Sequence, residues 1–291
     1  MEVMWSLIIF TLFVCISAGS FAVQGIYAIL GKQAKLQLPV LIIAFIALVI
    51  GGVGSFTHLQ HWERAFNGFG HITSGITQEL IGVILMVVAM LVYFVSMRKK
   101  ESVPKWAGVL AVVISCLMII LMTTSYMMPA RPIWNSFVLY LFYFAEAIVF
   151  GGAITWIVSD VVKTDNTKII ASRAAAIGAT LVVTLVLVYL VVFSSAGFAN
   201  VGYYYDPTQP TKAILDVNNI FGSVLAGENA IYFWLALLAG GLIPAIFALV
   251  KCKDGASGIS FGSIALVGAL VGGVSFRVLL YVLGYSAFLY F

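Results

Sequence analysis

The chain has 291 residues, of which 63% are apolar and only 9% are charged, and its formal net charge is +4. Water-soluble domains carry about a quarter of charged residues, so this composition excludes a soluble globular fold and makes lipid the main solvent. The few positive residues are spread over short connectors, which excludes a basic track for binding nucleic acid.

The sequence contains eight apolar segments that are long enough to cross a bilayer, which takes about 20 helical residues. Helices are expected because lipid offers the backbone no hydrogen-bond partners, and the alternating pattern of a membrane β-barrel is absent. We therefore predict an all-α integral membrane protein, a bundle of eight transmembrane helices that forms a single domain over residues 1–291. The predicted spans are 4–30, 38–57, 75–97, 105–127, 134–160, 168–195, 229–250 and 260–288.

The first span is expected to be retained in the membrane. Its N-terminal side has no basic residue, and the first positive residue, Lys32, follows it. A cleaved signal peptide shows the opposite order, with positive charge before the apolar segment.

Lysine and arginine are distributed unevenly between the two sides of the predicted bundle. The connectors after the first, third, fifth and seventh spans carry eleven of them, whereas the other connectors carry three. Cytoplasmic connectors are enriched in positive residues. The odd-numbered connectors are therefore predicted to be cytoplasmic, and both termini are predicted to face outward.

Residues 58–74 and 196–228 form the two long connectors, and both fall on the predicted outer side. Connectors of this length are usually functional or disordered. The second contains three consecutive tyrosines, Tyr203 to Tyr205, which favour a surface for docking a partner. A simple cap over the end of the bundle is the alternative.

The first long connector concentrates the groups that can exchange protons. His58, His61 and His71 are the three histidines of the chain, and Glu79 follows about one turn into the third span. A histidine and a carboxylate close to lipid suit the deprotonation of a lipid-soluble hydroquinone, which loses its protons as it loses its electrons. Glu79 is alternatively a helix-start carboxylate that the helix dipole favours.

Metal and haem sites find little support in the sequence. His58 and His61 form an HxxH pair, but catalytic zinc usually takes three protein ligands, and the other spans lack the histidines that a membrane haem requires. Cys15, Cys116 and Cys252 form no CxxC pair, and an iron–sulfur cluster takes about four cysteines. We expect the chain to hold no metal, haem or iron–sulfur cluster.

Three further polar residues lie within spans. Arg277, with Tyr281 one turn further on, is expected to pair with Glu79, to bind a quinone oxygen or to reach the lipid headgroups. Glu146 lies near the midplane of the fifth span, where a carboxylate is protonated or paired, and it fits either a proton path or a link between helices. Asp160 is interpreted as a boundary charge.

The segment that begins at His58 resembles a motif of the DmsC family, the membrane anchor subunits of dimethyl-sulfoxide-reductase-type molybdoenzyme complexes. The family pattern His-Leu-x4-Arg-Ala-Phe-Asn after the second span is matched from His58 to Asn67, with Arg64 at the arginine position. Glu79 matches the family glutamate early in the third span. The late Arg-x3-Tyr pattern is matched by Arg277 and Tyr281.

The resemblance extends to chain length, span count and outward termini. The sequence departs from the family pattern at Gln60, where the family usually has glycine, and His61 and Glu63 are additional polar residues.

What the resemblance implies is a membrane anchor that oxidises menaquinol in a prokaryotic inner membrane. His58 and Glu79 would accept protons, and Arg64, Arg277 and Tyr281 would help to bind the quinol. Electrons would pass to a four-cluster iron–sulfur subunit and then to a molybdopterin catalytic subunit, both on the outer face.

Two other functions stay open on the residues alone. One is a small-molecule or ion transporter that uses Glu146, since transporters place binding groups near the midplane. The other is a purely structural anchor, which leaves Glu79 and the histidines without a role.

Overall fold

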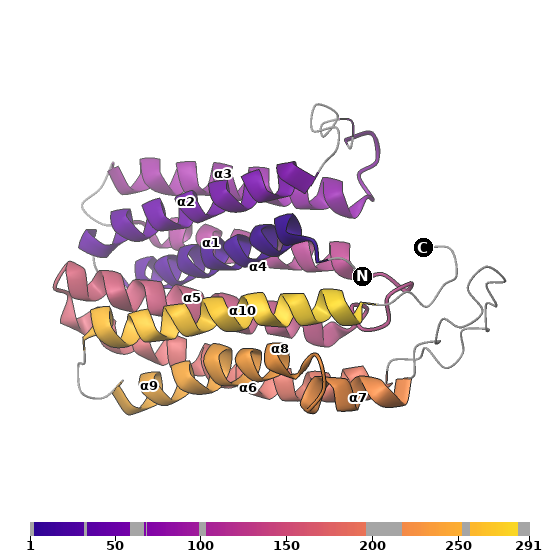
Figure 1. The fold of residues 1–291 in the computed structure, drawn as a ribbon. Coiled ribbons are helices and arrows are strands. Elements are labelled where there is room, and N and C mark those ends of the chain that lie inside the picture. Colours follow the sequence, from indigo (N-terminus) through magenta and orange to yellow (C-terminus); the bar gives the residue numbers. More distant parts are fainter. Residues whose placement is uncertain are drawn as a thin grey trace.

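Among the residues that the computed structural model describes, eight helices are long and apolar enough to cross a membrane, which confirms the predicted number of spans. They run side by side along a common axis (Figure 1). The structure describes residues 3–31, 34–58, 67, 69–98, 103–195, 217–251 and 257–284, and no strand occurs among them.

The first six spans are single helices, and the last two are composite. The six single helices are α1 (Trp5–Ile29), α2 (Ala34–His58), α3 (Gly75–Arg98), α4 (Lys105–Tyr126), α5 (Phe137–Val161) and α6 (Asp165–Ser195). The short helix α7 (Val217–Leu225) precedes the seventh span, which consists of α8 (Ala230–Trp234), η3 (Leu235–Leu242) and α9 (Ile243–Lys251). The eighth span consists of η4 (Gly258–Gly262) and α10 (Ser263–Leu283).

α1 lies at the centre of the bundle and α3 at its edge. In the most apolar part of α1, 72% of the residues are buried, whereas the corresponding part of α3 has only 28%. α1 packs against α2, α4 and α5, while α3 packs mainly against α4, and α6 packs against α5. The edge position leaves most of α3 facing lipid.

The seventh span changes to π-helical geometry in its middle, at η3, and the eighth span begins with the π-helical η4. η3 packs tightly on α10 at two glycines, because a Cβ atom on Gly240 would lie only 2.8 Å from the Cα of Gly272. These glycines bring the two backbones into direct contact.

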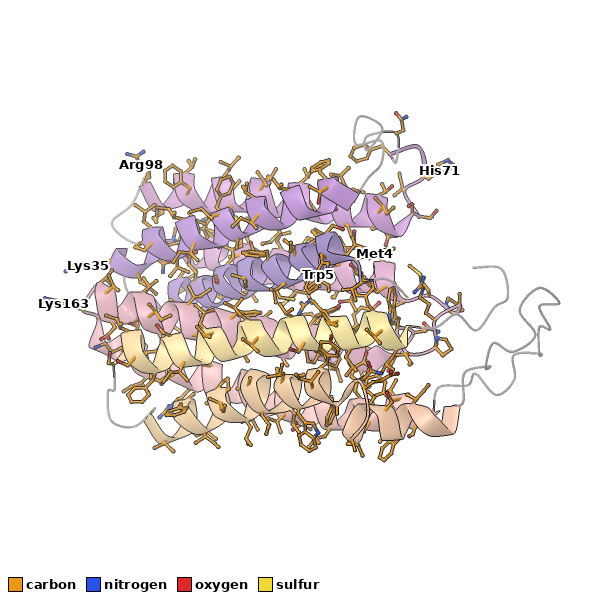
Figure 2. All side chains as sticks on the ribbon, in the orientation of Figure 1. Met4, Trp5, Lys35, His71, Arg98 and Lys163 are labelled. Atoms are coloured by element: carbon orange, nitrogen blue, oxygen red, sulfur yellow. The ribbon has the colours of Figure 1, made fainter. Side chains whose placement is uncertain are left out.

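The two ends of the bundle differ in their charged residues, as Figure 2 shows. Lys35, Arg98 and Lys163 lie at one end, which we call the lysine end. Met4, Trp5 and His71 lie at the other, which we call the histidine end. α1 begins and α10 ends at the histidine end (Figure 1).

Several predicted boundaries differ from the structure by three to five residues: α5 begins at Phe137 instead of 134, α6 begins at Asp165 instead of 168, and the eighth span ends at Leu283 instead of 288. α2 begins at Ala34 instead of 38, because a helix continues past the strictly apolar part that lipid requires. The connector 196–228, which we predicted to form a docking surface or a cap over the bundle, contains α7, whose Ile220 and Val224 are buried one turn apart. This short apolar repeat is obscured by its polar neighbours in sequence. Residues 196–216, with the three tyrosines, lie outside the described residues.

Candidate functional site

Glu79 is a buried carboxylate near the histidine end of α3. It is the fifth residue of the helix, its exposure is only 7%, and it accepts a hydrogen bond from the hydroxyl of Ser125, near the end of α4. A carboxylate that leaves water for a site beside lipid needs such a partner. Ser125 had not been singled out from the sequence, because a serine close to the end of an apolar span carries no distinctive pattern.

Two glycines of α3 place Glu79 against α4. Gly75, Glu79 and Gly82 are spaced by four and three residues, so they lie on one face of the helix. A Cβ on Gly75 would lie 2.8 Å from the Cβ of Ser125, and one on Gly82 would lie 2.7 Å from the sulfur of Met118. Glycine at position 75 allows the close approach that brings Ser125 to the carboxylate, and Gly82 leaves room for the side chain of Met118.

Glu79 also forms part of the wall of a pocket between α1, α2 and α3. The pocket encloses about 430 Å³ of empty space, including its open mouth. Phe56 and Ile76 on its rim are 40% and 58% exposed, so the pocket opens on the lipid-facing side of the bundle. Its lining consists of Phe10, Gly52, Ser55, Phe56, Ile76, Glu79, Leu80 and Val83. Among the described residues that line it, the pocket therefore offers an apolar chamber with one acidic group, Glu79.

The predicted histidine cluster is only partly described. His58 is the last residue of α2 and follows Ser55, which lines the pocket, by three residues, but its side chain lies outside the described part of the structure. His61 and Arg64 also lie outside the described residues. His71 is exposed at the histidine end (Figure 2) and does not line the pocket.

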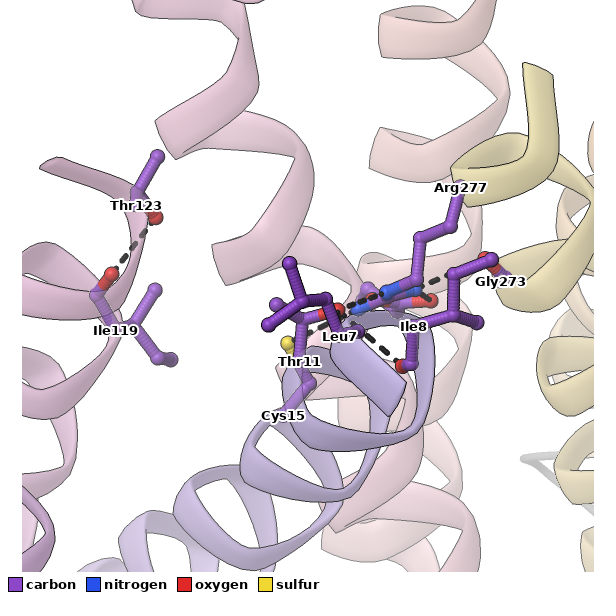
Figure 3. Close-up of polar contacts among 9 residues, drawn as sticks. Leu7, Ile8, Thr11, Cys15, Ile119, Thr123, Gly273 and Arg277 are labelled. Atoms are coloured by element: carbon purple, nitrogen blue, oxygen red, sulfur yellow. Dashed lines mark hydrogen bonds and ion pairs between the residues drawn. The ribbon is translucent and has the colours of Figure 1, made fainter. Parts of the chain in front are cut away.

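Arg277 forms the most extensive polar contacts of the described bundle. Its guanidinium makes a two-pronged ion pair with Glu146 of α5, with N–O distances of 2.7 Å for Nη1–Oε1 and for Nη2–Oε2. It also donates to Thr11 Oγ1 at 2.7 Å, to the carbonyl of Gly273 at 2.9 Å and to Cys15 Sγ at 3.5 Å. Figure 3 shows the side chain reaching toward Thr11 and Cys15 of α1.

These contacts correct the predicted pairing of Arg277 with Glu79. The partner is Glu146, and the arginine is only 1% exposed, so it does not reach the lipid headgroups. A guanidinium has five N–H donors, and each has an acceptor here. Of the two roles left open for Glu146, the contacts favour a link between helices, here joining α5 to α10 and α1.

Arg277 and Tyr281 line a second, smaller pocket. It encloses about 260 Å³ of empty space and shares no lining residue with the Glu79 pocket. The two residues do lie on one face of α10, as predicted, and the buried hydroxyl of Tyr281 has no hydrogen-bond partner. The predicted quinol-binding residues are thus distributed over two pockets. The lining of the second comprises Thr11, Tyr126, Trp134, Leu139, Tyr143, Arg277, Leu280 and Tyr281.

Comparison with protein families matches residues 1–283 to the model of the DMSO reductase anchor subunit, DmsC. The chain belongs to the DmsC family. The match spans nearly the whole sequence and confirms the resemblance on which the motif interpretation rests. A comparison with curated proteins returned no match. Membership, together with the eight apolar helices, makes the chain a multi-pass membrane anchor of a DMSO-reductase-type complex.

This DmsC-family anchor also has a polar contact at the lysine end that sequence analysis underestimated. Asp160, interpreted as a boundary charge, forms a 2.7 Å ion pair with Lys168. It accepts hydrogen bonds from Ser257 Oγ at 2.8 Å and from the backbone N–H of Ile259 at 3.1 Å. Asp160 therefore fastens the beginning of the eighth span to α5.

No group of three histidine, cysteine or acidic residues with the arrangement of a metal site occurs within the described ranges. His61 of the HxxH pair and Cys252 lie outside those ranges, so the expectation about metals stays a prediction. Cys15 and Cys116 are free cysteines, and Cys15 contributes its sulfur to the Arg277 contacts.

Proposed function

We propose that this anchor subunit oxidises menaquinol in the pocket that contains Glu79 and passes the electrons to an iron–sulfur subunit of its complex. The observation that carries the proposal is the buried carboxylate in the wall of a lipid-facing apolar pocket. A quinol reaches such a pocket from the bilayer, an apolar lining suits its ring, and its hydroxyl groups need a base.

The chemistry assigned to the pocket is proton acceptance. Oxidation of a hydroquinone to the quinone releases two electrons and two protons, and the protons must be removed as the electrons leave. Glu79 accepts one proton, while the hydrogen bond from Ser125 holds its carboxyl group in place. His58, at the end of α2, is the proposed second base, because a neutral imidazole accepts protons near neutral pH.

The two ends of the bundle support a direction for the reaction. Positive residues gather on the cytoplasmic side of membrane proteins, so we assign the lysine end to the cytoplasm and the histidine end to the outside of a prokaryotic inner membrane. Protons from the Glu79 pocket then leave on the outer face. The iron–sulfur subunit and the molybdopterin catalytic subunit dock there, on the connectors 58–74 and 196–228.

Arg277 and Tyr281 take a different place in this proposal from the one their motif implies. Arg277 has no free N–H for a quinone oxygen, and both residues line the second pocket. We assign Arg277 to holding α1, α5 and α10 together around the site. Its ion pair with Glu146 also weighs against the transporter alternative, which required Glu146 to bind cargo.

The experiment compares quinol oxidation by membranes that contain the full complex, in the wild type and in the His58→Ala and Glu79→Gln variants. General acid–base groups contribute about 10²–10⁴-fold to rate, so we expect a loss of that order. Reduction of the terminal substrate by an artificial electron donor serves as the assembly control and should persist.

Glu101→Gln is the matched control variant, because Glu101 follows α3 in the connector to α4 and its change removes the same charge outside both the pocket and the proposed docking connectors. Full quinol oxidation in both the His58→Ala and the Glu79→Gln complexes would refute the proposed site.

A further inference from the structure

A third pocket, which we call the tail pocket, lies on the same side of α2 and α3 as the Glu79 pocket, closer to the lysine end. It encloses about 650 Å³ of empty space, and only apolar residues line it. α2 contributes Leu38, Leu41, Ile42 and Phe45, and α3 contributes Met90, Leu91 and Phe94.

Helical spacing connects the two pockets on α2. Phe45 of the tail pocket precedes Gly52 of the Glu79 pocket by seven residues, and Phe56 of the Glu79 pocket follows four residues later. Residues separated by three, four or seven positions lie along one helix face. The two pockets therefore share one face of α2, with Val49 between them.

The same spacing holds on α3. Val83 of the Glu79 pocket precedes Met90 of the tail pocket by seven residues, and Phe94 of the tail pocket follows four residues later. Val87 lies between the pockets on this face and is partly buried. Val49 and Val87 mark the middle of the strip between α2 and α3 that joins the two pockets, which we call the α2–α3 seam.

The seam is loosely packed. α2 packs along much of α1 but touches α3 at few places, although α3 follows it in the sequence. Val49 is 48% exposed, and Ile42 and Leu91 are 49% and 56% exposed, so lipid-facing side chains border the seam along its length. An apolar chain from the bilayer has access to it.

We propose that the α2–α3 seam holds the isoprenoid tail of the quinol whose ring occupies the Glu79 pocket. The proposal rests on the proposed function and adds where the tail of the menaquinol lies, with its end directed toward the lysine end. From Glu79 to Phe94 there are fifteen residues of α3, or about 22 Å at 1.5 Å per residue. This length suits several isoprene units.

A larger apolar groove elsewhere in the bundle does not serve the same purpose. It lies between α1, α2, α5 and α10 and encloses about 820 Å³ of empty space. On α2 it uses Ile43, Ile46, Ala47 and Ile50, a different helix face from Phe45, Gly52 and Phe56, and it contains no residue of the Glu79 pocket. Position on the same face, and not size, selects the seam.

The test uses two donors with the same ring: menaquinol with its natural tail, and 2,3-dimethyl-1,4-naphthoquinol, in which a methyl group replaces the tail. Membranes with the full complex are compared for wild type and Val49→Trp, which places an indole between the pockets. The matched control is Val191→Trp on α6, where the valine is 64% exposed and far from the seam.

We expect Val49→Trp to raise the KM for menaquinol by about tenfold, a binding effect without loss of chemistry, and to leave the KM for the tail-less quinol unchanged. Val191→Trp should change neither. Equal effects on both donors, or no effect on either, would overturn the inference. If the wild-type complex oxidises neither quinol, the proposed function itself fails. If it oxidises both, but Val49→Trp affects both donors equally, only the inference about the tail fails and the proposed function stands.

A labelling experiment on the wild-type complex does not depend on the variant. A menaquinone analogue with a diazirine at the end of its tail should label Ile42, Leu91 or Phe94, and excess menaquinone should prevent labelling. A phospholipid with a diazirine in its acyl chain forms the second arm. Labelling of the same residues by the phospholipid alone, without competition from menaquinone, would make the seam a lipid site and overturn the inference.

Discussion

Arg277 and Glu146 form a two-pronged ion pair, with both N–O distances at 2.7 Å, between helices whose facing side chains exclude solvent almost completely. The two residues are 1% and 2% exposed. Burying either charge alone costs several kcal/mol, and the attraction between the two offsets this cost only when the remaining donors and acceptors are satisfied. Thr11, Cys15 and Gly273 supply the remaining acceptors.

Removing one partner of this pair should destabilise the bundle. We expect Glu146→Ala to lower the free energy of unfolding by about 3–5 kcal/mol, because it leaves the guanidinium buried without a counter-charge. The check is thermal unfolding of the purified complex in detergent, with Glu101→Gln as the control. The double variant Glu146→Leu with Arg277→Met should recover part of the loss. If Arg277→Met instead kept full stability and abolished quinol oxidation, Arg277 would be a quinol ligand.

Ser125→Ala should slow quinol oxidation less than loss of the carboxylate does. The variant removes one hydrogen bond to a charged group, worth about 1.5–3 kcal/mol, so we expect a decrease of about 10–100-fold in kcat/KM. Ser194, an exposed serine of α6, gives the control variant Ser194→Ala. Unchanged kinetics in Ser125→Ala would show that the Glu79 carboxyl group needs no fixed orientation for its work.

Gly75→Ala should impair both stability and quinol oxidation. The new Cβ would lie 2.8 Å from the Cβ of Ser125 and 3.0 Å from its Cα, so α3 must move away from α4. Overpacking of this kind typically costs about 1–3 kcal/mol. Val88→Ala is the control, because Val88 is a residue of the same helix that is 50% exposed. The thermal midpoint and the quinol oxidation rate are measured together, and wild-type values for both would contradict the close α3–α4 contact.

Tyr281→Phe tests whether quinol oxidation uses the Glu79 pocket or the second pocket, which Arg277 and Tyr281 line. The tyrosine hydroxyl is buried without a hydrogen-bond partner, so its removal should leave stability unchanged or raise it slightly. Because Tyr281 lines the second pocket and not the Glu79 pocket, quinol oxidation should stay within about twofold of wild type. Tyr189→Phe removes another buried hydroxyl without a partner and is the control. A selective loss of quinol oxidation in Tyr281→Phe would restore the role that the Arg-x3-Tyr pattern implies.

Much of the architecture followed from the sequence alone. Backbone polar groups in lipid must be satisfied within each segment, so eight long apolar segments predict eight helices. The uneven lysine and arginine counts predicted that one end would gather Lys35, Arg98 and Lys163. The motif from His58, with Glu79, was sufficient to indicate the DmsC family.

Only the tertiary structure decided which polar groups meet. Arg277 could pair with either Glu79 or Glu146 as far as its sequence position is concerned, and the adjacency of α5 and α10 selects Glu146. Ser125 became relevant only because Gly75 and Gly82 bring α3 onto α4. Every span here is apolar around most of its circumference, so periodicity contains little information about which faces touch. Helix packing, set by small residues and by the few buried polar contacts, supplies that information.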